Sequence, residues 1–165
     1  MVSGVQGEGV FVVETGRKPD DEPDQAGGES DGQAEQAGQA GSVAPPSVRA
    51  VRGANQIDSD DRDAILAGTA DLVTEVMQRN ALSADDIISI IFTATPDLTA
   101  EFPAYAARQL GLTDVPLLCS TEISVPGAMP RVLRLLAHVE TRRTRAEIRH
   151  VYLGGAAALR TDLPQ

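Results

Sequence analysis

Sulfur and aromatic residues are scarce in this chain of 165 residues, which has one cysteine, no tryptophan, three phenylalanines and two tyrosines. A lone cysteine, Cys119, excludes an internal disulfide framework, and we therefore expect a cytoplasmic protein. Long hydrophobic runs are also missing, since no segment approaches the ~18 apolar residues of a membrane-spanning helix. The first residues lack the basic and apolar regions of a secretory signal. We therefore expect a domain with few aromatic side chains for its core and no membrane contact.

Positive charge is scarce as well, because 14 basic residues stand against 24 acidic ones and the net charge is −10. Residues 1–46 hold nine acidic residues against Arg17 and Lys18, a net charge of −7. Residues 47–165 hold 15 acidic residues against 12 arginines, a net charge of −3. Affinity for nucleic acid depends mostly on neutralising phosphates. An acidic chain without a basic face is therefore a poor candidate for binding it.

The first 46 residues are rich in Gly, Gln, Ala, Ser and Asp, and they show no helical or strand periodicity. Such a segment cannot bury enough apolar surface to offset the entropy that it would lose on ordering. We predict that residues 1–46 are a disordered acidic extension and that residues 47–165 form one domain.

Neither a nucleophilic centre nor a metal site is indicated by the remaining residues. Cys119 has no base near it in the sequence, and His138 and His150 lack the spacing of metal ligands. A metal site needs several Cys, His or carboxylate ligands in a compact pattern. We expect no metal and no cofactor, and we interpret both histidines as structural.

Apolar residues three and four positions apart predict three helices. The first spans 60–79, with Ser59 as its N-terminal cap and Asn80 as its left-handed stop. A proline at the first position and a glycine after the end predict a short helix over 103–110. The third helix is predicted over 127–139, with a proline tolerated in its first turn.

Runs of alternating or continuous apolar residues predict five strands. A strand over 48–52 is predicted to end at Gly53, and the β-branched run over 87–94 predicts a strand in the centre of a sheet. The other three predicted strands are 115–120 and the two arms of a hairpin, 148–153 and 156–160, joined by Gly154 and Gly155.

These elements follow the order β-α-β-α-β-α-β-β, which is typical of an α+β fold with helices covering a mixed sheet. Three helices are too few to cover both faces of so apolar a sheet. We therefore expect an oligomer in which part of the sheet is buried against sister subunits.

Arginine supplies every positive charge of the predicted domain. Four arginines lie at predicted strand ends or on predicted helices, namely Arg52, Arg108, Arg134 and Arg160. A guanidinium group presents a fixed fork of donors that suits carboxylates, and it stays charged at any physiological pH. The arginines therefore indicate a site for a ligand that carries carboxylates.

Four segments carry a resemblance to a known family. "VRGAN", "ATPDLTAEFPAYAARQLG", "VPLLCSTEISVPGAMPRVLR" and "IRHVYLGGAAALRTDL" resemble, in order and spacing, the AroH-type chorismate mutases. The resemblance covers nearly all of residues 48–163, and the combination of ATPDL, FPA, C-x-x-E and LR-x-DL is specific. Residues 1–46 have no counterpart in that family.

The resemblance implies a homotrimer whose sheets pack into a barrel-like core, with active sites in the clefts between subunits. It also implies the conversion of chorismate to prephenate, an intramolecular Claisen-type rearrangement in phenylalanine and tyrosine biosynthesis. Family members use no cofactor and no metal for this reaction. The implied partners are the ligands chorismate and prephenate and other copies of the same chain.

The resemblance also implies roles for individual residues. Arg134 matches the arginine that faces the ether oxygen of chorismate, where negative charge grows in the transition state. Arg52 and Tyr152 match the residues that hold the carboxylate of the side chain and fold the arm over the ring. Glu122 and Cys119 match the pair that meets the ring hydroxyl.

Eight further residues are implied to contact the substrate, as apolar walls or at the mouth of the cleft. They are Phe102, Ala104, Tyr105, Arg108, Leu117, Leu118, Leu159 and Arg160. Two of these depart from the family pattern, which has a lysine at the position of Tyr105 and a threonine at that of Leu118. The lost lysine removes a cation near the cleft, so binding is expected to rely more on Arg108 and Arg160.

Two other functions were weighed against this one. A trimeric family of imine and enamine deaminases has a similar architecture and an arginine at its subunit cleft, but the ATPDL and C-x-x-E segments do not resemble it. A non-catalytic anion-binding trimer is the other alternative, with Tyr105 and Leu118 as marks of lost activity. Taken one at a time, the site residues read as ordinary structural residues. Their joint occurrence, with Arg52, Glu122, Arg134 and Tyr152 all present, favours the mutase.

Overall fold

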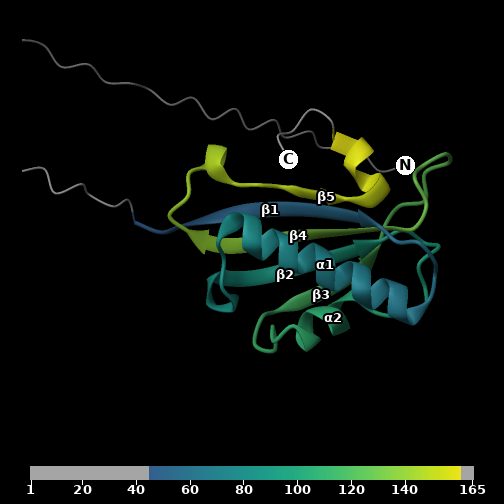
Figure 1. Cartoon of the computed structure of the whole chain (residues 1–165), viewed down its shortest axis with the longest axis horizontal. Coiled ribbons are helices and arrows are strands. Elements are labelled where there is room, and N and C mark those ends of the chain that lie inside the picture. The colour runs from purple at the N-terminus through teal and green to yellow at the C-terminus, as the bar shows by residue number, and fades with distance from the viewer. Residues whose placement is uncertain (1–44, 161–165) are drawn as a thin grey trace, which may run out of the picture. The chain divides into compact units, whose positions relative to one another are not determined.

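The computed structural model describes residues 45–160, and these residues form a mixed five-stranded sheet packed against helices (Figure 1). The strands are β1 (Ser47–Gln56), β2 (Ile87–Ala94), β3 (Leu117–Thr121), β4 (Val132–Thr141) and β5 (Val151–Leu153). They lie in the order β3-β2-β4-β1-β5. Strand β4 pairs antiparallel with both β1 and β2, whereas the outer pairs β2–β3 and β1–β5 are parallel. The predicted α+β class with a mixed sheet is confirmed, and the predicted extension over 1–46 lies almost wholly outside the described residues.

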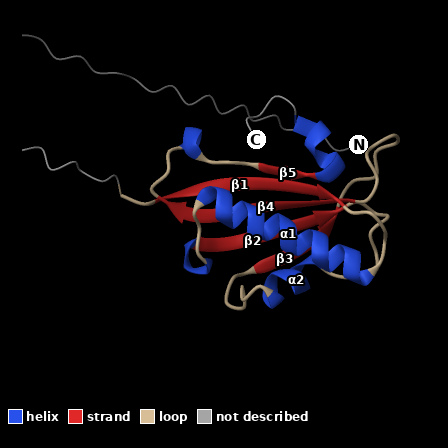
Figure 2. Ribbon diagram, viewed as in Figure 1, coloured by secondary structure: helices blue, strands red, loops and turns tan. Residues whose placement is uncertain are grey.

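Both α-helices of the described range, α1 (Arg62–Asn80) and α2 (Pro103–Gln109), pack on one face of the sheet (Figure 2). Their buried side chains share one core cluster with Val51 of β1, Phe92 of β2 and Leu135 of β4. Three short 3-10 helices complete this range, namely η1 (Ala84–Asp86), η2 (Arg145–Glu147) and η3 (Gly154–Arg160). Within residues 45–160, no helix is both long and apolar enough to span a membrane.

Helix α1 begins and ends slightly later than its sequence predicts. Asp61, not Ser59, is the N-terminal cap, and its carboxylate accepts a backbone N–H of the first turn at 2.9 Å. The left-handed residue at the other end is Ala81, with φ of 52°. Asn80 is instead buried inside the last turn, where its amide exchanges hydrogen bonds of 2.8 Å with the backbone of Arg149. The predicted stop was wrong because this asparagine is used for a tertiary contact.

The third predicted helix does not exist, because residues 132–141 form strand β4. The residues that suggested a helix lie on both faces of this strand. Leu133 and Val139 point into the helix-covered core, whereas Val132 and Leu136 lie on the opposite side. A strand in the middle of a sheet is apolar on both faces, and such a run mimics helical spacing.

The predicted C-terminal hairpin is also wrong. Strand β5 is followed directly by η3, and residues 156–160 belong to that 3-10 helix. Gly154 adopts a φ of 54° at this junction. Its missing side chain also leaves room for Asn55, whose Oδ1 would lie 3.4 Å from a Cβ at this position. The glycine therefore turns the chain onto β1 instead of reversing it into a second arm.

Gly53 lies inside β1 and does not end it, so this strand is twice as long as the predicted segment 48–52. Leu72 of α1 packs over the glycine, and its Cδ1 would lie only 3.0 Å from an added Cβ. Close approach of the helix, and not a break in the strand, is the physical reason for glycine here.

The face opposite α1 and α2, which we call the open face, carries a mixture of charged and apolar side chains. It includes Arg52 of β1, Thr93 of β2 and Arg134 of β4, since their neighbours in each strand point into the core. Val48 and Leu118 on the same face are 59% and 58% exposed. Exposed large apolar residues on a sheet face are typical of an interaction surface.

Candidate functional site

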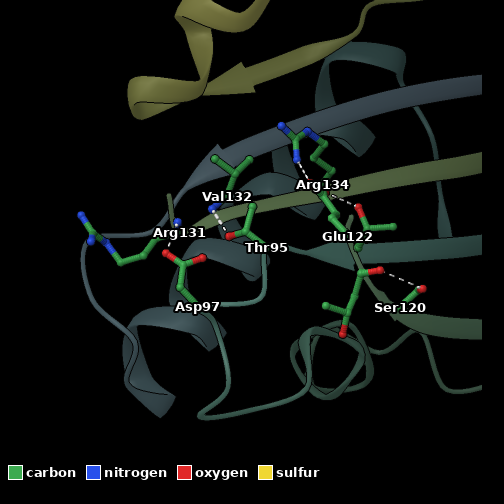
Figure 3. Close-up of polar contacts among 9 residues, drawn as sticks. Thr95, Asp97, Ser120, Glu122, Arg131, Val132 and Arg134 are labelled. Carbon is green, nitrogen blue, oxygen red and sulfur yellow. Dashed lines mark hydrogen bonds and ion pairs between the residues drawn. The ribbon is translucent and has the colours of Figure 1, made fainter. Parts of the chain in front are cut away.

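An arginine and a glutamate form an ion pair on the open face. Arg134 lies in β4 between Ala54 of β1 and Thr93 of β2, and its Nη1 donates to Glu122 Oε2 (Figure 3). The two side chains are only 32% and 19% exposed. Partial burial reduces screening by water, so this pair is held more firmly than an ion pair in solvent.

Glu122 is held in place from a second direction. Thr93 Oγ1 donates to its Oε1 at 2.6 Å, and its backbone N–H donates to the carbonyl of Ala94 at 2.9 Å. Because Thr93 and Arg134 belong to neighbouring strands in register, the three side chains form one small network. The carboxylate therefore fixes the guanidinium on a rigid sheet and not on a mobile loop.

The network opens into a cavity of about 200 Å³ at the end of the sheet. Glu122 and Arg134 form its inner wall, and the segment between β3 and β4 forms its outer wall. Remaining wall residues come from the turn after β2. They are Thr95, Pro96 and Asp97. A guanidinium with free donors at the wall of a cavity is suited to bind an anion.

A second arginine, Arg52, lies on β1 at the edge of a cavity of about 410 Å³ that His150 also lines. The backbone N–H of Arg52 donates to His150 Nδ1 at 3.1 Å. This bond needs an unprotonated Nδ1. Burial, followed by the nearby charges of Arg52 and Arg160, lowers the pKa of His150 below its ordinary value. The neutral ring is thus close enough to two arginines of the predicted site to feel their charge.

Tyr152 lies on β5 with its ring buried against Ala54, Val132 and Ala156, and Leu159 packs against the same cluster. The residue is 7% exposed, and its hydroxyl has no hydrogen-bond partner among the described residues. A buried hydroxyl without a partner costs about 1–3 kcal/mol. Such a group indicates that a ligand or another chain supplies the missing acceptor.

Several other predicted residues lie on the helix-covered side of the sheet. Phe102, 70% exposed at the start of α2, and Cys119 of β3 line a third cavity of about 350 Å³. Ala104 and Leu117 lie in or against the core. Tyr105 packs against the guanidinium of Arg62, which lies 5.4 Å from the ring centre.

Comparison with known proteins decides the family. Residues 48–163 match the family model of chorismate mutase type I. The chain belongs to the type I chorismate mutases. Chorismate mutases are isomerases, and the protein is therefore an enzyme of that class.

Individual chorismate mutases agree with this assignment. The chorismate mutase AroH of Thermus thermophilus is 44% identical over 117 residues, which cover 70% of this chain and 96% of that protein. The chorismate mutase AroH of Bacillus subtilis (strain 168) is 37% identical over 117 residues, covering 70% of this chain and 92% of that protein. The solved chorismate mutase from Clostridium thermocellum matches with a TM-score of 0.66 and 46% identity, covering 67% of this chain and 98% of that one.

The structure divides the predicted residues of this chorismate mutase into two sets. Arg134 and Glu122 meet on the open face, but Cys119 points to the helix side, so the C-x-x-E pair is divided by the sheet. Arg108 is exposed on α2, and Leu118 is exposed on the open face. One chain alone therefore does not bring all thirteen residues to one cavity.

Sequence reasoning missed three residues of this region. Thr93 holds Glu122, and its signal was a hydroxyl inside an otherwise apolar strand. Thr95 and Asp97 line the cavity of Arg134, although the ATPDL motif had drawn attention to them only as family markers. His150, interpreted from the sequence as structural, accepts the backbone N–H of Arg52.

Proposed function

We propose that this chorismate mutase converts chorismate to prephenate by holding the folded dianion and placing Arg134 at its ether oxygen. The observation that carries the proposal is the partly buried guanidinium of Arg134, fixed by Glu122 at the wall of a cavity. Only one of its nitrogens is used in that ion pair. The guanidinium carries further N–H donors that can meet a substrate.

The rearrangement breaks the ether C–O bond ahead of C–C bond formation, so negative charge grows on the ether oxygen. A donor that is already oriented costs no reorganisation when that charge appears, and it favours the transition state over the ground state. Glu122 and Thr93 supply this orientation. No proton transfer is required for the reaction, and the residues act by charge and position alone.

The two carboxylates of chorismate need cationic or hydroxyl partners. Arg52 and the buried hydroxyl of Tyr152 are candidates for one carboxylate, because the two residues lie on neighbouring strands. Arg160, close enough to His150 to affect its charge, is a candidate at the mouth. A flexible arm held at both ends loses its freedom on binding, which brings the reacting carbons together.

The complete site is proposed to form between copies of the chain in a homotrimer. The wall of Phe102 and Cys119 lies on the helix side of the sheet, and the Arg134 network lies on the open face. If a neighbouring copy placed its Phe102 and Cys119 wall next to the Arg134 network of this copy, one cleft would contain both groups of predicted residues. The exposed Val48 and Leu118 support burial of the open face against such a copy.

A cytoplasmic location and a place in phenylalanine and tyrosine biosynthesis belong to the same proposal. So does the division of the chain into an acidic extension over 1–46 and a mutase domain over 47–165. The departures at Tyr105 and Leu118 bear on affinity, because Tyr105 packs against Arg62 and provides no cation of its own.

The test is the loss of the ultraviolet absorbance of chorismate with the purified full chain. Arg134→Ala is expected to lower kcat by about 10²–10³-fold or more, the usual effect of removing one oriented donor. Arg79→Ala is the matched control, because Arg79 also pairs with a glutamate, Glu75, on the surface of α1. No turnover in a folded parent would favour the anion-binding alternative. Equal turnover in the parent and Arg134→Ala would exclude the proposed role of Arg134.

A further inference from the structure

The residue directly before strand β4 has a backbone conformation that L-amino acids rarely adopt. Arg131 has a φ of 51°, in the left-handed region, directly before the first residue of the strand. A side chain with a Cβ is crowded in this conformation, and glycine is its usual occupant. Such a residue persists only where its surroundings hold it.

The contacts of Arg131 account for this conformation. Its backbone N–H donates to Asp97 Oδ2 at 2.8 Å, and its side-chain Nε donates to the carbonyl of Ile57 at 3.0 Å. The N–H of Ile57 in turn donates to the carbonyl of Arg131 at 2.7 Å. The turn is therefore tied to the end of β1 through Ile57 and to the loop after β2 through Asp97, and Figure 3 shows the second contact.

The next residue is held by the same motif. The N–H of Val132 donates to Thr95 Oγ1 at 3.0 Å, and the N–H of Thr95 donates to the carbonyl of Val132 at 3.0 Å. The Thr95 hydroxyl also donates to Asp97, and this bond is the main cause that lowers the pKa of Asp97. Asp97 is therefore a carboxylate at neutral pH, with its oxygens occupied by donors.

The position of Arg134 follows from these contacts. It is the third residue of β4, two positions after Val132, and its side chain reaches the open face only in the present register. A slip of one residue would move it to the helix-covered face. The start of the strand thus decides where the guanidinium of Arg134 lies.

We propose that Thr95 and Asp97 are positioning residues for Arg134, acting through the left-handed turn at Arg131. The inference rests on the role proposed above for Arg134. Thr95 and Asp97 also line the cavity, so direct contact with the substrate is the competing explanation. A carboxylate facing a dianion would repel it, and both groups already have partners in the chain.

The first test compares deletions with conservative replacements. Asp97→Ala and Thr95→Val are expected to lower kcat by roughly ten- to a hundredfold, because a shift of about 1 Å can cost this much. KM should change less than kcat. Asp97→Asn and Thr95→Ser, which keep an acceptor oxygen, should retain most of the turnover. Asp71→Ala, which removes an exposed carboxylate of α1 that does not line the cavity, is the control.

The second test asks whether the effect passes through the turn and through Arg134. Glycine adopts a positive φ without crowding, so Arg131→Gly should restore part of the kcat lost in Asp97→Ala. In an Arg134→Lys background, Asp97→Ala should cost much less than it does in the parent. Equal losses in both backgrounds, or turnover of all four Thr95 and Asp97 variants equal to that of Asp71→Ala, would overturn the inference.

A spectroscopic measurement separates this inference from the proposed function. The guanidinium N–H signals of Arg134, paired with Glu122, should move or broaden in Asp97→Ala and keep their place in Asp71→Ala. Unchanged signals would overturn the positioning role even if the parent were inactive. An inactive parent, or full activity of Arg134→Ala, would count against the proposed function instead. If Asp97→Ala fails to fold, Thr95→Val, which also removes a contact of the turn, carries the same readouts, with Thr95→Ser as its conservative partner.

Discussion

The two faces of strand β4 differ in what their side chains do. On the helix-covered face, Leu133, Leu135 and Ala137 are almost wholly buried in the core. On the open face, Arg134 and His138 alternate with them, and both are partly exposed and hydrogen-bonded to polar side chains, Arg134 to Glu122 and His138 to Ser89. One strand therefore supplies both the rigidity of the sheet and the charge that is proposed to act on the substrate.

We therefore expect substitutions on the helix-covered face of β4 to change stability and substitutions on its open face to change activity. The covered face stabilises the fold by burying apolar area, at roughly 25 cal/mol for each Å². The open face does little of this, since its charged groups are partly solvated and such ion pairs contribute modestly to stability. Its value lies in the fixed direction of Arg134.

The largest expected effect on stability is that of Leu135→Ala. Leu135 is 4% exposed, and truncation of a buried leucine costs about 2–5 kcal/mol. Chemical denaturation should show this loss, while kcat per folded molecule stays close to that of the parent. Leu110→Ala, at a leucine 43% exposed after α2, should change stability much less. A fall of kcat in fully folded Leu135→Ala would mean that the two faces are not separable.

Tyr152→Phe is expected to have a smaller effect and to do the reverse of Leu135→Ala, since it should weaken substrate binding without lowering stability. Loss of one hydrogen bond to a charged group should raise KM by about tenfold or more, if the hydroxyl meets a substrate carboxylate. Stability should not fall, because phenylalanine removes a buried hydroxyl that has no partner in the described chain. Reduced stability with an unchanged KM would assign the hydroxyl to a contact between subunits.

The same contrast explains what the sequence could predict. Helix α1 and strand β2 lie close to their predicted bounds, because α1 carries a helical period and β2 a continuous β-branched apolar run, and both signals are local. Strand β4 was predicted as a helix, because its apolar residues serve two faces and its partners, β1 and β2, are distant in the chain. Pairing with strands that are distant in the chain leaves no signal in the local sequence. The local sequence of β4 therefore shows only the helix-like spacing of its apolar residues.

The residues of the candidate site could be predicted from the family resemblance more than from the physical properties of the local sequence. Arg134 by itself resembled an exposed arginine, and nothing local indicated its pairing with Glu122 or the support from Thr93. The division of Cys119 and Glu122 between two faces could not be predicted either. It follows from the alternation of β3 and from the turn of the chain at its end, which only the assembled sheet defines.

The smallest expected effect concerns the edge of the sheet, where His150, directly before β5, accepts the backbone N–H of Arg52. The pKa of His150 lies below its ordinary value of 6.5, so the unfolded chain binds the proton more readily than the folded chain does. Stability from the neutral ring is fully present above pH 6.5 and is lost as the pH falls through the folded pKa. Carboxylates titrate mostly below about pH 5, so a change of stability between about pH 5 and pH 6.5 is expected to come from histidine.

Thermal denaturation of the parent should therefore show a decrease in Tm as the pH falls from 6.5 toward the folded pKa of His150. His150→Asn keeps an acceptor near the position of Nδ1 but does not titrate, so its Tm should be flatter over the same window. His138→Asn, at the histidine bonded to Ser89 on β2, should keep the slope of the parent. A slope that follows His138 instead would place the pH sensitivity in the centre of the sheet. The edge contact at Arg52 would then contribute nothing measurable.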